Sequence, residues 1–244
     1  MSENEIIRKL VMYELKNTPV IKYVLTAFCI GLVVYLVGDF LESILDEGRL
    51  PVLYDILFLM VLSLPISTIR YKPFTTQNLK GEFYGSSFFI LLKQTPISEK
   101  AIRKSRFIMT GLYTVVLNTL MFALLYLFSE QLQANLTVGQ AIILCICWVS
   151  VSYIWGGVMA AAEPGGSYSM FALFIWLIVY LFVFIAIFTA FNLLFGAPFV
   201  IWSFEMAQTS PILLILLSVG IAIISTMIWI FEFKRYEKKA DYHV

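Results

Sequence analysis

Long apolar runs between clusters of charge constrain this 244-residue chain most strongly. A helix needs about 20 apolar residues to cross a hydrocarbon core of ~30 Å, and the charges divide the chain into six such segments. The runs are continuously apolar and do not alternate, which disfavours the strands of a membrane barrel. We therefore predict an all-α polytopic membrane protein with six transmembrane helices. The expected spans are Thr18–Gly38, Val52–Thr68, Phe107–Ser129, Val138–Ala162, Tyr168–Leu194 and Ile212–Phe231.

Composition supports a membrane location. The chain is 60% hydrophobic and 14% charged, whereas soluble domains are ~45–50% apolar and ~25% charged. Too few polar residues remain to cover a water-facing surface. The second span is the weakest of the six, because it is short, carries Asp55 near its start and has Pro65 near its end.

The lysines and arginines predict the orientation. Sixteen of the 17 basic residues lie before the first span or at its start, between spans two and three, or after span six, and only Arg49 lies elsewhere. Basic residues concentrate on the cytoplasmic side of membrane proteins. We expect both termini in the cytoplasm and no cleavable signal peptide.

Residues 1–17 are expected to form an interfacial amphipathic helix ahead of a single transmembrane domain at 18–244. Its apolar half faces away from Arg8, Lys9 and Lys16, and Glu14 is a misfit within the apolar arc. Such a helix is a simple anchor or an elbow that moves with the first span.

The loop at 69–106, between spans two and three, is the only sizeable soluble element that we expect. Within it, Glu82–Lys93 is apolar, aromatic and too short to cross a membrane, so we expect a short interfacial helix. Pro96 then turns the chain, and Ser98 is a good N-cap for a basic helix that leads into span three. The apolar patch either packs under neighbouring spans or docks a cytoplasmic partner. Its residues are Phe83, Tyr84, Phe88, Phe89 and Leu92.

Three further features concern the other connections. Glu163, in the short link between spans four and five, is either a functional contact or a solvated interfacial carboxylate, and we expect the latter. The small residues from Gly156 to Ala162 suit close helix packing, inside the protomer or at a dimer seam. Residues 192–211 are apolar but interrupted, which predicts a re-entrant hairpin of two short helices on the outer side.

Several kinds of chemistry are missing from the sequence. There is no phosphate-binding G-x-x-x-x-G-K-[ST] loop, the one histidine is His243 near the end, and the three cysteines lie in apolar runs. Asp55 is the only acid within a predicted span, which disfavours an ion-coupled carrier. We expect no catalytic residue, no metal, no cofactor on this chain and no nucleic-acid partner.

The layout resembles the permease (transmembrane) subunits of ABC type 2 exporters. The resemblance covers nearly the whole chain, and its most telling stretch is LLKQTPISEKAIRKSRFI, Leu91 to Ile108. The family places a Leu-rich short helix, a Pro-Ile/Val-Ser turn and a basic helix just ahead of the third span. This chain departs from it at Gln94-Thr95, where many members carry a leucine or a small residue.

The resemblance implies a transport subunit that works as a pair, identical or related, and is driven by a separate cytoplasmic ABC ATPase that binds the ATP. Phe83 to Leu92 would then dock on the ATPase, and Pro96-Ile97-Ser98 would relay its movement to span three. The alternatives are a non-transporting membrane scaffold or immunity protein, and an ion-coupled secondary carrier. The expected location is a plasma membrane, with a bacterial one favoured.

Overall fold

The computed structural model describes residues 2–47 and 52–240, and the side chains among them outside 39–54. This part of the chain is predominantly helical, with ten α-helices and three very short strands. The helices are α1 (Glu3–Asn17), α2 (Val20–Glu47), α3 (Val52–Ile69), α4 (Ser87–Lys93), α5 (Glu99–Phe128), α6 (Glu130–Asn135), α7 (Val138–Ala161), α8 (Met170–Phe195), α9 (Phe199–Thr209) and α10 (Pro211–Lys239).

Five helices are long and apolar enough to cross a membrane: α2, α5, α7, α8 and α10. The predicted all-α fold is therefore confirmed for the described residues, and its five long apolar helices are consistent with a membrane protein. The expected second span forms α3, whose described apolar part is Asp55–Ile69. The whole helix, Val52–Ile69, has 18 residues and reaches about 27 Å at 1.5 Å per residue, slightly less than the ~30 Å of a hydrocarbon core.

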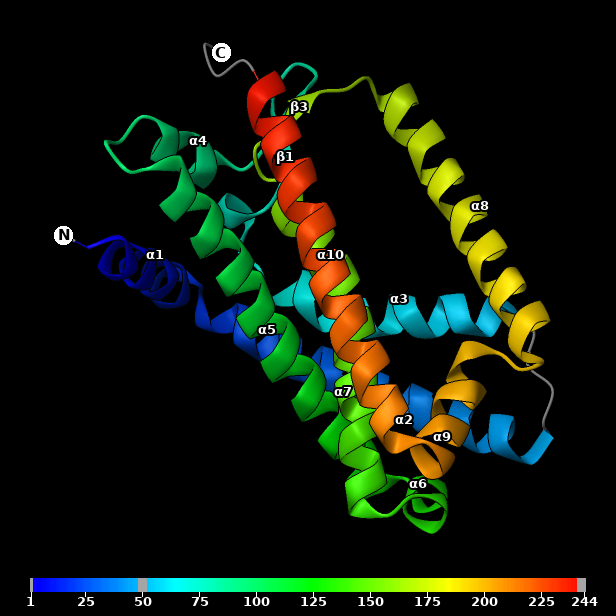
Figure 1. Ribbon diagram of the computed structural model, residues 1–244. Coiled ribbons are helices and arrows are strands. Elements are labelled where there is room, and N and C mark those ends of the chain that lie inside the picture. Colours follow the sequence, from blue (N-terminus) through cyan, green and yellow to red (C-terminus); the bar gives the residue numbers. More distant parts are fainter. Residues whose placement is uncertain (1, 48–51, 241–244) are drawn as a thin grey trace.

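Helix α7 forms the centre of the bundle, between α5 and α10 (Figure 1). Its small residues permit this close approach. A Cβ atom at Gly156 would meet the Thr114 side chain of α5, and one at Gly157 would collide with the Trp229 indole of α10. Both glycines therefore serve packing within the protomer, as small residues do between membrane helices.

Helix α8 diverges from the bundle. Figure 1 shows its first turns far from α10 and its last turns close to α9. Only 6% of its most apolar stretch is buried, against 44% for α5. It packs chiefly against α3 and α9, and one aromatic stack, between Trp155 of α7 and Phe184, joins it to α7 with ring centroids 4.9 Å apart.

The two ends of the bundle differ in composition. One end carries α1, the segment between α3 and α5, and the last turns of α10, and we call it the basic end. At the opposite end lie α6 and α9 (Figure 1). Asp55 caps α9 there, because its carboxylate accepts hydrogen bonds from the backbone N–H groups of Phe199 at 2.7 Å and Val200 at 3.1 Å.

The expected outer hairpin contains one short helix where two were predicted. Helix α8 continues to Phe195 and ends at Gly196, which has a positive φ of 72°. This left-handed conformation favours glycine, and a glycine that adopts it commonly ends a helix. Helix α9 then follows, and α10 begins at Pro211.

The expected helix over Glu82–Lys93 is also shorter than predicted. Strands β1 (Gln77–Lys80), β2 (Phe83–Gly85) and β3 (Gly166–Ser167) form a small antiparallel sheet in the order β1-β2-β3. Helix α4 begins only after this sheet, because the Ser86 hydroxyl caps it by accepting from the N–H of Phe89. Hydrophobicity alone did not distinguish the strand β2 from the helix α4.

Candidate functional site

Helix α4 lies at the basic end and buries the aromatic side chains that the sequence singled out. Phe88, Phe89 and Leu92 are all buried, and Phe89 is fully so. The Phe88 ring stacks on Tyr13 of α1 at a centroid distance of 5.4 Å. Phe89 packs edge-on against Phe233 of α10 at 5.5 Å. The α4 aromatics therefore hold the helix to the rest of the protein and do not form an open patch.

The other two aromatics of the expected patch lie in β2. Phe83 is buried, and Tyr84 is half-buried with its hydroxyl 3.0 Å from the sulfur of Met170, at the start of α8. Four of the five expected docking side chains are thus covered within the protomer, which favours the packing alternative for the side chains themselves. Their role in coupling stays a prediction.

The surface that α4 and the next turn offer to a partner is smaller and more polar. Leu91 is 55% exposed, and Gln94, Pro96 and Ser98 are also exposed, whereas Ile97 is half-buried. Sequence reasoning missed Leu91 as a contact candidate. No local signal separated Leu91 from its neighbours, because it lies three residues after the buried Phe88, a spacing that by itself predicts the same helix face.

The turn at residues 94–98 is held at both sides. The predicted N-cap is confirmed, since the Ser98 hydroxyl accepts from the N–H of Ala101 at 3.3 Å. Before the turn, Lys93 pairs with Glu99 at 2.7 Å and with Glu237 of α10 at 2.6 Å. The turn therefore connects directly to the first turn of α5 and to the end of α10.

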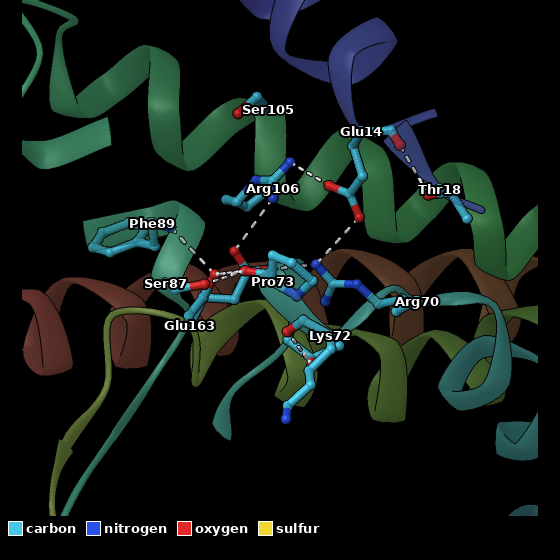
Figure 2. A network of polar contacts seen from close by, with 12 residues as sticks. Glu14, Thr18, Arg70, Lys72, Pro73, Ser87, Phe89, Ser105, Arg106 and Glu163 are labelled. Atoms are coloured by element: carbon cyan, nitrogen blue, oxygen red, sulfur yellow. Dashed lines mark hydrogen bonds and ion pairs between the residues drawn. The ribbon is translucent and has the colours of Figure 1, made fainter. Parts of the chain in front are cut away.

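Beneath α4 lies a ring of four alternating charges, which we call the charge ring (Figure 2). Glu14 comes from α1, Arg70 follows α3, Arg106 belongs to α5, and Glu163 follows α7. Arg106 Nη2 lies 2.5 Å from Glu14 Oε2, and Arg70 Nη2 lies 2.5 Å from Glu163 Oε1. Two longer contacts close the ring: Arg70 to Glu14 at 3.7 Å, and Arg106 to Glu163 at 3.6 Å.

The charge ring is fully removed from solvent, with side-chain exposures of 0–1%. The two carboxylates and two guanidinium groups balance, so the ring carries no formal net charge. Arg106 also lies over the Phe88 ring at 5.2 Å, a cation–π contact that links the charges to α4. Because each ion pays a large desolvation penalty, such a ring persists only when all its partners are in place.

Arg70 retains its charge in this setting. Burial disfavours the charged guanidinium, but Glu163 and Glu14 more than offset this, so the pKa of Arg70 lies above its ordinary value. Several ring atoms have no hydrogen-bond partner in the described structure, among them Nε of Arg70 and Nε of Arg106. The attraction between opposite charges must therefore supply part of the stabilisation that hydrogen bonds would give.

The sequence placed these four residues only in part. Glu163 was expected to be solvated, and that is wrong: its carboxylate is 0% exposed because it faces two arginines. Glu14 interrupts the apolar arc because it belongs to the buried face of α1, together with Ile7 and Leu10. An acid on an apolar face was the signal for a buried cation, but nothing local identified Arg70 or Arg106 as the partner.

The described arrangement is one of packing and ion pairing. The described residues contain no group of His, Cys, Asp and Glu side chains able to hold a metal ion. The charge ring joins residues of α1 and α5 to the residue that follows α3 and to the one in the link after α7. Comparisons with protein-family models, with curated proteins and with solved structures find no match to this chain.

Proposed function

We propose that the protein is the membrane-spanning permease subunit of an ATP-driven exporter of the ABC type, coupled to a separate ATPase through the segment between α3 and α5. The observation that carries the proposal is that this segment is folded and is tied to the bundle by buried ion pairs. It is a folded unit flanked by two residues of the buried charge ring: Arg70 at its start, and Arg106 two turns into α5, the helix that follows it. A force applied to it must reach α1, α5 and α7 together.

The path of that force runs through stiff elements. Helix α4 is held between α1 and α10 by aromatic contacts. The capped turn at 94–98 leads directly into α5, a continuous helix of 30 residues. In this proposal the ATPase contacts Leu91, Gln94 and Pro96, and the buried Phe88, Phe89 and Leu92 pass the displacement to the bundle.

The proposal also places the chain in the membrane. The basic end faces the cytoplasm, and α1 lies along the inner interface. Helix α3 serves as a short sixth span, and neighbouring helices cover the rest of the membrane thickness. Both termini are then cytoplasmic. The substrate pathway lies along this subunit and a second permease protomer, in a bacterial plasma membrane.

Gentle detergent purification of the tagged protein from its native membrane tests the class. We expect a soluble ATPase to copurify in a fixed ratio and to show vanadate-sensitive ATP hydrolysis. A protein that is correctly inserted but emerges alone and inert would favour the non-transporting scaffold.

A variant pair tests the contact surface. Leu91→Asp should release the ATPase while leaving the fold intact, because that side chain is exposed. Met12→Asp is the matched control, an exposed apolar residue of α1 at the same end. Equal loss of the ATPase in both variants, or in neither, would contradict docking at α4.

A further inference from the structure

A groove of about 660 Å³ lies at the basic end between α1, α5 and α10. Its volume is within the ~300–1,000 Å³ that is typical of ligand sites. It shares no residue with the charge ring, and the coupling proposal does not use it. Its lining residues are Asn4, Ile7, Arg8, Val11, Arg103, Lys104, Phe107, Ile108 and Ile230.

The lining divides into two chemical halves. Three cations, Arg8, Arg103 and Lys104, form one half, and apolar side chains from all three helices form the other. Among the described residues, none that lines the groove is acidic. Such a site suits a molecule with an anionic head and an apolar tail.

The cations differ in how far neighbouring acids neutralise them. Lys104 pairs with Glu3 at 2.7 Å, and Arg103 reaches Glu237 at 3.8 Å. Arg8 is exposed and has no ion pair within the described part of the chain. Glu3 and Glu237 are themselves shared with Lys100 and Lys93, at 3.4 Å and 2.6 Å. The cluster therefore keeps an excess of positive charge beside Arg8.

The position of the groove selects the occupant. It opens where the basic, exposed side of α1 meets α5 and α10, two helices long and apolar enough to cross a membrane. Basic pockets between such helices, at the cytoplasmic headgroup level, suit anionic phospholipid heads. We infer that this groove binds one anionic glycerophospholipid, with its phosphate beside Arg8, Arg103 and Lys104 and the start of an acyl chain against Phe107, Ile108 and Ile230.

This inference depends on membrane embedding but not on the exporter proposal, so either can fail without the other. A lipid held here would connect α1 to α5 and α10 through its acyl chain. This link would add to the one that the charge ring already provides. It would make α1 sensitive to the lipid composition of the leaflet in which it lies.

Native mass spectrometry of the detergent-purified full chain tests the site. Phosphatidylglycerol and phosphatidylcholine are titrated separately, and we expect selective retention of one phosphatidylglycerol. Arg8→Gln should lower that retention about fivefold, the effect of one charge near an anionic headgroup. Lys16→Gln, an exposed lysine on the same helix outside the groove, should leave it unchanged.

A second pair tests the apolar half. Ile108→Trp should fill the groove and lower phosphatidylglycerol retention, whereas Ile142→Trp, at an exposed position of α7, should not. Thermal unfolding of each variant identifies changes that result from lost folding.

Three results would overturn the inference. Equal retention of the two lipids, or equal losses in Arg8→Gln and Lys16→Gln, would reduce the effect to general surface charge. Displacement of the lipid by millimolar glycerol phosphate, with that compound binding alone as tightly, would reassign the site to a soluble phosphate.

Discussion

Helix α8 and the basic end differ in how firmly they are held to the rest of the protein, although both belong to a mostly apolar chain. At the basic end, α1, α4, α5 and α7 are joined by a fully buried ring of four charges and by aromatic contacts. Helix α8 is apolar along its whole length and is almost entirely exposed. The most apolar span is therefore the one that its own protomer fixes least.

This difference follows from the solvent. Lipid tails are as apolar as leucine, so the hydrophobic effect does not drive one membrane helix onto another. Close packing of small residues and polar contacts do that work instead. Helix α7 has Gly156 and Gly157 for close packing, and the basic end has the charge ring. Helix α8 has little of either, which leaves its surface for lipid or a second protomer.

The largest expected effect breaks the charge ring. Glu163→Gln removes the carboxylate between Arg70 and Arg106 and leaves buried positive charge unbalanced, so we expect the free energy of unfolding to fall by about 3–5 kcal/mol. Denaturant or thermal unfolding in detergent measures it. Glu205→Gln, an exposed acid of α9, is the control and should change little.

A double variant sharpens this test. Replacing Arg70 and Glu163 together with methionine removes an ion pair without leaving an unpaired charge, and it should be less harmful than Glu163→Gln alone. The single variants Arg70→Met and Glu163→Met complete the test. If their two stability losses add up to the loss of the double variant, the ring is not a coupled unit.

The same substitution in the two regions measures their difference directly. Phe89→Ala empties a fully buried site and should lower stability by about 3–5 kcal/mol. Phe182→Ala, at a position of α8 that is 65% exposed, should change it by about 0.5 kcal/mol or less. Comparable losses in both would mean that α8 packs against more than the structure of one protomer shows.

Asp55 provides a smaller test at the opposite end. Asp55→Leu removes the cap of α9 and leaves two backbone N–H groups unpaired, which should lower stability by about 1–3 kcal/mol. Asp55→Asn can still accept a hydrogen bond and should be milder. If Asp55→Asn instead abolished transport at full stability, an ion-coupled carrier would replace the ATP-driven proposal.

The smallest effect concerns pH. Hydrogen bonds from lysine lower the pKa of Glu3 and of Glu99 below the ordinary 4.5. The stability that these pairs contribute is therefore present above pH 4.5 and is lost as the pH falls through the lowered values. A slight fall of the melting temperature below pH 4.5 should be reduced in the Glu3→Gln/Glu99→Gln variant. An unchanged pH profile in that variant would assign the fall to other carboxylates.

The sequence itself determined the class of fold, because runs such as Phe107–Ser129 and Val138–Ala162 have no charge and can only be buried in lipid or protein. It also determined local features that depend on neighbours in the chain, such as the Ser98 cap of α5. It did not separate β2 from α4, because both are apolar and the sheet partner Gly166-Ser167 lies about 80 residues away.

Only the tertiary structure decided the partners of the charged residues. Glu14 and Arg106 are 92 residues apart, as Arg70 and Glu163 are 93 apart, and no local pattern joins them. The same holds for Asp55, which caps a helix 144 residues away. Apolar character is a property of each segment and can be read locally, whereas ion pairing depends on which segments the fold brings together.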